Sequence, residues 1–109
     1  MPGTITEPER GTRKRSSEDY TPLYHVVLLD DDEHTYDYVV EMLVQLFALD
    51  AAEAWNRAVE VDTTGRTVVI TCDLDAAEFG RDQIHAFGAD WRMPNCKGSM
   101  SAIVEPCRG

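Results

Sequence analysis

The sequence has no run of about 18 apolar residues, the length that a helix needs to cross the hydrocarbon core of a bilayer. It also lacks the charged and then apolar N-terminal pattern of a secretory signal peptide. We therefore expect a cytoplasmic protein with no membrane partner.

Cysteine is scarce, with residues at positions 72, 96 and 107. This odd number, without any CxxC spacing, predicts neither a disulfide framework nor a zinc site, and reduced thiols are expected. The sequence also lacks a phosphate loop, a Ser/His/Asp set and close pairs of metal ligands. These absences favour a protein that is not an enzyme and that needs no cofactor or metal.

Basic residues are half as numerous as acidic ones, with 10 Lys and Arg against 20 Asp and Glu and a net charge of −10. Residues 1–22 contain four of each sign, so the whole excess lies in residues 23–109. Such a surface repels nucleic acid, which we exclude as a partner, and attracts a cationic ligand. The charge can also serve only to keep the protein in solution, so it does not identify a partner by itself.

The first 21 residues differ in composition from the rest of the chain. They are rich in Pro, Gly, Ser, Thr and charged residues, and they hold too little apolar surface to offset the entropy of ordering. We predict a flexible tail over residues 1–21 and one folded domain over residues 22–109.

Hydrophobic periodicity predicts six elements in this domain. Short β-branched and apolar runs predict three strands, at residues 24–30, 66–73 and 99–105. Three helices are expected to begin at the capping residues Thr35, Asp50 and Asp75, with Glu53 and Glu78 completing the second and third capping patterns.

The order β-α-α-β-α-β predicts the fold class. We expect an α/β (α+β) domain in which a three-stranded antiparallel sheet packs against three helices on one face. Gly65 and Gly88 are expected to end the second and third helices. Trp55 and Trp91 are expected to be packing residues.

An acidic cluster follows the first predicted strand and is the strongest candidate for a functional site. Its members, with one carboxylate after the second helix, are Asp30, Asp31, Asp32, Glu33, His34 and Asp62. Crowded carboxylates raise one another's pKa unless a cation or hydrogen-bond donors compensate. A solvated acidic loop, a metal-binding enzyme site and a different protein-interaction surface all remain compatible with this cluster, although it lacks the spacing of an EF-hand loop.

Two longer segments carry a resemblance to a known family. YHVVLLDDDEHTYDYVVEMLVQLF and AEAWNRAVEVDTTGR are similar to the core of the ClpS family of Clp protease adaptors. Members of that family have a strand, an N-D-D-x-T-P-M-type turn into a helix, and a second helix that ends in a valine–histidine pair before a glycine. The similarity continues through VVITCDLDAAE and covers about residues 23–105.

The resemblance implies binding of N-degrons, which are proteins marked for degradation by a bulky apolar first residue. In the family, the Asn-Asp pair and the histidine hydrogen-bond the free α-amino group and the first peptide. Asp30 stands at the asparagine, Asp31 at the aspartate, Asp62 at the histidine and His34 at the family's threonine. We expect these four residues to bind the amino group of an N-degron peptide.

The resemblance also implies a pocket for the first side chain, lined by Tyr36, Val39, Ala58, Val61 and Met100. Because Ala58 replaces a methionine of many members, we expect a wider pocket that also admits Ile- and Val-first peptides.

The other partner implied by the resemblance is a Clp AAA+ unfoldase of the ClpA or ClpC type. Asp75 and Glu78 match acidic positions of the family's docking surface, whereas Gly80 replaces a lysine there. The tail over residues 1–21 is expected to engage the unfoldase during delivery by a monomeric adaptor.

Overall fold

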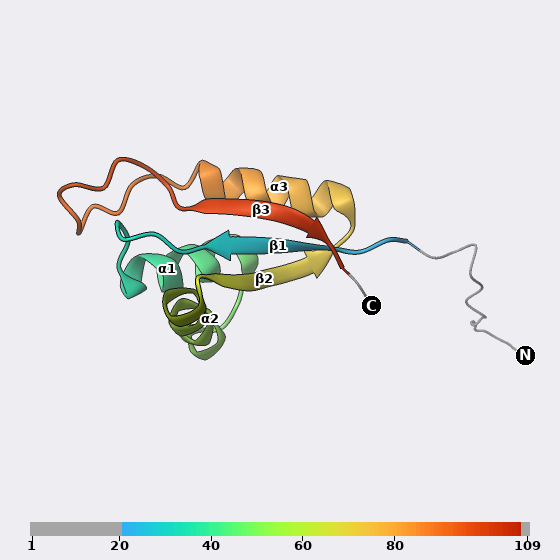
Figure 1. The fold of residues 1–109 in the computed structure, drawn as a ribbon, viewed down its shortest axis with the longest axis horizontal. Coiled ribbons are helices and arrows are strands. Elements are labelled where there is room, and N and C mark those ends of the chain that lie inside the picture. Colours follow the sequence, from blue (N-terminus) through green and yellow to red (C-terminus); the bar gives the residue numbers. More distant parts are fainter. Residues whose placement is uncertain (1–20, 108–109) are drawn as a thin grey trace, which may run out of the picture.

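The computed structural model describes residues 21–107. The predicted flexible tail, residues 1–21, therefore lies outside the described residues except for Thr21. Three strands and three helices follow one another in the predicted order (Figure 1). Their bounds are β1 Tyr24–Leu29, α1 Tyr36–Phe47, α2 Ala51–Thr64, β2 Arg66–Cys72, α3 Leu74–His85 and β3 Ser101–Pro106.

The sheet has the order β2-β1-β3, and both pairings are antiparallel. The central strand β1 ends at Leu29, which lies opposite Arg66 on one side and Ser101 on the other. Since both of these residues begin their strands, the end of β1 is flanked by the starts of β2 and β3. The predicted fold class is confirmed.

All three helices pack on one face of the sheet, where they form a single core. Val26 and Leu28 of β1 contribute to this core and are completely buried. Helix α3 covers β3 and β1, while α2 packs against β2 (Figure 1). The helical part of the core comes from side chains that recur at helical spacing, including Tyr38, Met42, Leu43, Ala54, Ala58, Val61, Ala77 and Ile84.

Gly80 allows α3 to approach the rest of the core closely. A Cβ atom at this position would lie 3.0 Å from Cε1 of Phe47 on α1 and 3.5 Å from Cδ1 of Ile70 on β2. The absence of a side chain therefore lets the helix rest directly on both neighbours.

Two of the three predicted helix starts are confirmed, and the third is wrong. The side chains of Thr35 and Asp50 accept hydrogen bonds from the backbone N–H groups of Tyr38 and Glu53. The cap of α3 is Asp73, whose carboxylate accepts from the N–H of Ala76 at 2.9 Å, so Asp75 lies inside the first turn. Asp73 directly follows β2 and is still extended, which places its side chain correctly for capping.

The other boundaries differ slightly from the predicted ones. Gly65 ends α2 with φ 92°, as predicted. Helix α3 ends at His85 and not at Gly88, although Gly88 does have a positive φ of 104°. Strand β3 begins at Ser101, two residues later than predicted.

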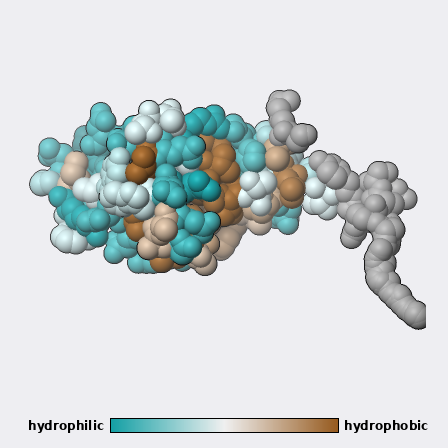
Figure 2. Space-filling model, turned by 90° about the horizontal axis from the view of Figure 1, so that it is seen from below, coloured by the Kyte–Doolittle hydropathy of each residue, from teal (hydrophilic) through white to brown (hydrophobic). Residues whose placement is uncertain are grey.

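The prediction that both tryptophans are packing residues is wrong for Trp91, whereas Trp55 is partly exposed and packs with one edge against Tyr36. Trp55 is 48% exposed and Trp91 is 79% exposed. Trp91 lies on the loop between α3 and β3, where the guanidinium of Arg92 stands 4.6 Å from the centre of its ring. On the face shown in Figure 2, hydrophilic residues predominate and hydrophobic ones gather near the middle. No helix within residues 21–107 has both the length and the hydropathy to cross a membrane.

The capping assignment of α3 can be tested with two neighbouring aspartates. Asp73→Ala should lower the free energy of unfolding by about 1 kcal/mol, because it removes the acceptor of a free helix N–H group. Asp75→Ala should have an effect of only a few tenths of a kcal/mol, since Asp75 interacts with the helix dipole alone. Urea denaturation of both variants measures the difference, and an equal or reversed order would contradict the assignment.

Candidate functional site

The candidate functional site lies where β1 ends and the two outer strands begin. The backbone N–H of Asp30 donates to the carbonyl of Gly65 at 3.0 Å, which holds the end of α2 beside the acidic turn. Met100 directly precedes β3 and reaches the same point from the other side. The topology of the sheet thus brings three distant segments of the sequence to one location.

A pocket opens at this location, and the structure places all nine residues predicted for the amino-group and side-chain sites around it. Thr35 is the additional lining residue. The full lining is Asp30, Asp31, His34, Thr35, Tyr36, Val39, Ala58, Val61, Asp62 and Met100.

One wall of the pocket is apolar. Val39, Ala58, Val61 and Met100 are each between 1 and 4% exposed. They come from α1, α2 and the segment before β3, so this wall is continuous with the protein core. An apolar group of a ligand could be removed from water against this wall, and little polar surface of the protein would be buried with it.

The other wall carries three carboxylates, and among residues 21–107 no Lys or Arg lines the pocket. Asp31 accepts from the backbone N–H of Glu33 at 2.9 Å and faces Nδ1 of His34 at 2.7 Å, both through Oδ1. Within residues 21–107, no donor is bonded to its second oxygen. Asp31 is therefore oriented by two contacts and keeps one oxygen for a ligand.

Asp62 is held in a similar way from across the pocket. The hydroxyl of Tyr36 on α1 donates to Oδ2 of Asp62 on α2 at 2.5 Å. This hydrogen bond raises the pKa of the Tyr36 phenol, because it stabilises the protonated form. The Tyr36 ring packs edge-on against Trp55 at 5.0 Å between centres, which gives the exposed Trp55 a place in the site.

Asp30 shows the effect of crowded negative charge. Partial removal from water and the nearby charge of Asp62 raise the pKa of Asp30 above its ordinary value. A cation bound between these carboxylates would stabilise their ionised forms. The electrostatics of the pocket therefore favour a positively charged ligand.

His34 lies at the pocket as predicted, but its contacts indicate a different role from that predicted. Its side chain is only 2% exposed, and Nε2 lies 2.7 Å from the carbonyl oxygen of Gly98 while Nδ1 faces Asp31. Both ring nitrogens are thus occupied by protein oxygens. The contacts indicate that His34 orients Asp31, so direct contact of its nitrogens with a ligand is not supported by this geometry.

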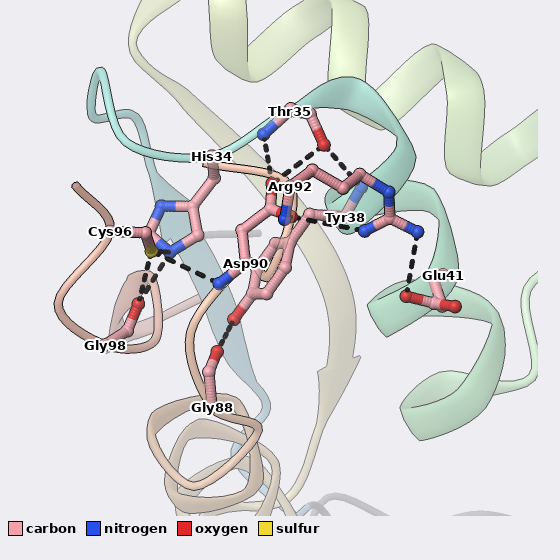
Figure 3. A network of polar contacts seen from close by, with 9 residues as sticks. All are labelled: His34, Thr35, Tyr38, Glu41, Gly88, Asp90, Arg92, Cys96 and Gly98. Carbon is pink, nitrogen blue, oxygen red and sulfur yellow. Dashed lines mark hydrogen bonds and ion pairs between the residues drawn. The ribbon is translucent and has the colours of Figure 1, made fainter. Parts of the chain in front are cut away.

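Asp90 is a central residue of the site region that the sequence analysis missed (Figure 3). It is 1% exposed, and its Oδ2 accepts from both the backbone N–H and the hydroxyl of Thr35, each at 2.8 Å. Its Oδ1 accepts from the backbone N–H of Arg92 at 3.0 Å and from Nη1 at 3.2 Å. Arg92 also reaches Glu41 at 3.4 Å, so the loop before β3 is tied to the middle of α1 as well as to its cap.

Burial opposes the ionisation of Asp90, but the hydrogen bonds from Thr35 and Arg92 outweigh it. They hold the pKa of the Asp90 carboxyl below its ordinary value. No sequence signal indicated this role, because Asp90 and Thr35 are 55 positions apart in the chain.

The two residues predicted to contact an unfoldase lie away from this pocket. Asp75 and Glu78 are on α3, which begins where β2 ends. Cys72 at the end of β2 pairs with Tyr24 at the start of β1, so these residues lie at the opposite end of the sheet from Asp30. In the described part of the chain, no three His, Cys, Asp or Glu side chains converge as a metal site requires.

The role of Asp90 can be tested by the pH dependence of stability. At pH 7, Asp90→Asn should lower the free energy of unfolding by about 1–3 kcal/mol, because buried donors lose their charged acceptor. A group with a depressed folded-state pKa stabilises the fold above its unfolded pKa of about 3.9, and this contribution is lost as the pH falls through the folded pKa.

The difference in the free energy of unfolding between the unsubstituted protein and Asp90→Asn should therefore become smaller below about pH 4. Asp82→Asn, at an exposed site on α3, serves as the control and should change stability little at either pH. A deficit that is independent of pH would contradict the assigned role of the carboxylate.

Comparison with known proteins gives one consistent result. The family described as ATP-dependent Clp protease adaptor protein ClpS matches residues 19–94. An ATP-dependent Clp protease adapter protein ClpS of Synechococcus sp. is 35% identical over 88 residues, which cover 80% of this chain and 92% of the relative. The ClpS of Acetivibrio thermocellus is 32% identical over 84 residues, 77% of this chain and 80% of the relative.

A solved structure shares the fold. Agrobacterium tumefaciens ClpS2 bound to L-phenylalaninamide superposes with a TM-score of 0.69 at 24% sequence identity. The superposition covers 81% of this chain and the whole of that chain.

Proposed function

Because this chain belongs to the ClpS family of ATP-dependent Clp protease adaptors, we propose that its pocket binds the free N-terminal residue of substrates for a Clp protease. The family consists of adaptor proteins and not of enzymes. The proposal concerns the ligand of the pocket, which is a protonated chain start with a bulky apolar first side chain.

One observation carries the proposal: three carboxylates face an apolar wall, and no Lys or Arg of the described residues lines the pocket. An α-amino group has a pKa of about 7.7–8.0 in model peptides, so at neutral pH it is mostly a cation. Hydrogen bonds between a cation and carboxylates are roughly twice as strong as neutral ones. The adjacent apolar wall would receive the side chain of the same residue.

The free carboxylate oxygens suggest how the amino group is held. In the described structure, Oδ2 of Asp31 and Oδ1 of Asp62 receive no hydrogen bond, and Asp30 lies beside them. An ammonium group has three N–H donors, so it could donate one hydrogen bond to each of the three carboxylates. His34 and Tyr36 would hold Asp31 and Asp62 in place.

The ligand of the structural neighbour has the chemistry that this pocket suits. L-phenylalaninamide, which is bound to the Agrobacterium protein, combines a free α-amino group with an aromatic side chain. Such a molecule would place its ammonium against the aspartates and its ring against Val39, Val61 and Met100.

A second surface would contact the unfoldase. Asp75 is exposed on α3, and Phe79 one turn further along the helix is 64% exposed. Together with Glu78 they form an acidic surface with an aromatic residue, and aromatic side chains are enriched in protein interfaces. We place the unfoldase contact on this part of α3.

Substitution of Asp31 tests the proposed amino-group site. Asp31→Ala should weaken the binding of a Leu-first peptide by about 10- to 100-fold, since a hydrogen bond to a charged group contributes about 1.5–3 kcal/mol. Fluorescence anisotropy with a labelled peptide measures the change. Asp32→Ala is the matched control, because Asp32 is an exposed neighbour that does not line the pocket.

The same peptide with an acetylated N-terminus should bind to neither protein, because acetylation removes the positive charge and two of the three donors. Equal affinity for the free and acetylated peptides would refute the proposed function.

The breadth of the pocket can be tested at Ala58. The unsubstituted protein should bind Ile- and Val-first peptides as well as Leu-, Phe-, Tyr- and Trp-first ones. Ala58→Met should weaken Ile and Val binding about tenfold more than Leu binding, because the larger side chain crowds a branched Cβ and each buried methylene contributes about 0.8 kcal/mol.

Thermal unfolding of Ala58→Met checks that the fold accommodates the larger side chain, since Ala58 is buried in the core. An unchanged ratio between Ile and Leu affinities in a folded variant would show that Ala58 does not control selectivity.

A further inference from the structure

Cys96 lies beside the ring of His34 (Figure 3), and with Asp31 these side chains form a line of three reactive groups beside the proposed binding site. Its Sγ is 3.3 Å from Nε2 of His34, and Nδ1 of His34 is 2.7 Å from Oδ1 of Asp31. Thiol, imidazole and carboxylate thus follow one another at contact distance. In many enzymes, this order of groups activates a cysteine. The imidazole accepts the thiol proton as a base, and the carboxylate orients the imidazole.

Two backbone groups complete the surroundings of the sulfur. The N–H of Asp90 donates to Sγ at 3.2 Å. The carbonyl of Gly98 lies 3.2 Å from Sγ and 2.7 Å from Nε2 of His34. This oxygen can accept a hydrogen bond from the thiol or from an N–H at Nε2.

The thiol is within reach of solvent. Cys96 is half-buried, and both Asn95 and Lys97 beside it are exposed. Reactive cysteines are found in partly exposed sites close to cationic or proton-accepting groups, because the thiolate is the nucleophile. His34 is such a group, at 3.3 Å from the sulfur.

The two other cysteines of the chain differ from Cys96. Burial and the nearby charge of Asp73 raise the pKa of the Cys72 thiol, which disfavours its reactive form. Cys107 follows β3, and among the described residues no imidazole contacts its sulfur. These cysteines provide internal controls for the chemistry of Cys96.

We propose that Cys96 is a modification site for low-molecular-weight disulfides, and that its modification weakens the binding of an N-terminal residue in the adjacent pocket. The second part rests on the function proposed above. The first part does not depend on it.

The reaction is a thiol–disulfide exchange. The Cys96 thiol gives its proton to Nε2 of His34, and the thiolate attacks one sulfur of the small disulfide. A new S–S bond to Cys96 forms as the old S–S bond breaks, and the leaving thiolate takes the proton from His34. Cys96 is oxidised, and one half of the small disulfide is reduced to a free thiol.

Modification would disturb the binding site through His34. A half-buried sulfur that carries a bulky group has to move towards solvent, which breaks its contacts with the N–H of Asp90 and with the His34 ring. The ring would then lose part of the packing that fixes it against Asp31. Since the orientation of Asp31 depends on His34, the ammonium site would be misaligned.

The modification site is tested by the kinetics of exchange with 4,4′-dithiodipyridine at pH 7, which reports each thiol by absorbance. In the full chain, C72S/C107S leaves Cys96 as the only thiol, and C72S/C96S leaves Cys107. Cys96 should react at least about tenfold faster than Cys107, and adding His34→Asn should remove about tenfold of that rate. Circular dichroism confirms that each variant is folded.

The proposal of a modification site is overturned if Cys96 reacts no faster than Cys107, or if the His34→Asn variant is folded and retains the full rate. Asp31→Asn provides a second variant, because it keeps the shape of the side chain that orients the His34 ring. It should also slow the exchange reaction of Cys96. An unchanged rate in that variant would contradict the proposed line of three groups.

The coupling is tested by anisotropy with a Leu-first peptide. After treatment of C72S/C107S with oxidised glutathione, affinity should fall about tenfold and return after addition of dithiothreitol. C72S/C96S should be unaffected. If the modified protein binds the peptide as tightly as the untreated protein, the proposed coupling is wrong. If the untreated protein binds no peptide at all, both the proposed function and the coupling are wrong. In that case the exchange rates still decide whether Cys96 is a modification site.

Discussion

The antiparallel pairing at the end of β1 is the constraint on which the functional site depends. Leu29 is hydrogen-bonded between the first residues of β2 and β3, and the N–H of Asp30 extends the ladder to Gly65. This pairing positions the last turn of α2 and the segment before β3 on either side of the acidic turn. A change of register by one residue would separate Asp62 from Asp30 and would turn the buried face of β1 outwards.

Within this frame, the pocket keeps three carboxylates together by giving two of them partners. Asp31 is oriented by His34 and by a backbone N–H, and Asp62 is oriented by the Tyr36 hydroxyl. Each of these contacts uses one oxygen, and no donor of residues 21–107 is bonded to the other. The remaining repulsion is expressed in the raised pKa of Asp30, and a bound cation would relieve it.

The parts of this structure that local chemistry determines could be predicted from the sequence. Thr35 and Asp50 were identified as caps because a capping side chain acts within three residues of its own position. The start of α3 was misplaced because Asp75 and Glu78 have the spacing of a capping pattern, whereas Asp73 is followed three residues later by Ala76 and is identified as the cap only by its place directly after β2. The pocket residues came together as the resemblance implied, whereas Asp90 could not be found because its partner Thr35 is distant in sequence and its loop is irregular.

The location of α3 has a consequence for how such an adaptor would work. The start of this helix and the pocket lie at opposite ends of a strand of six residues, which is about 17–20 Å long. A protein seated on Asp75 and Phe79 would therefore leave the pocket open, and the domain could hold two proteins at the same time. Delivery would then depend on effective concentration, because a chain bound in the pocket stays close to the protein bound at α3. Even a modest affinity at each of the two sites would then give efficient transfer.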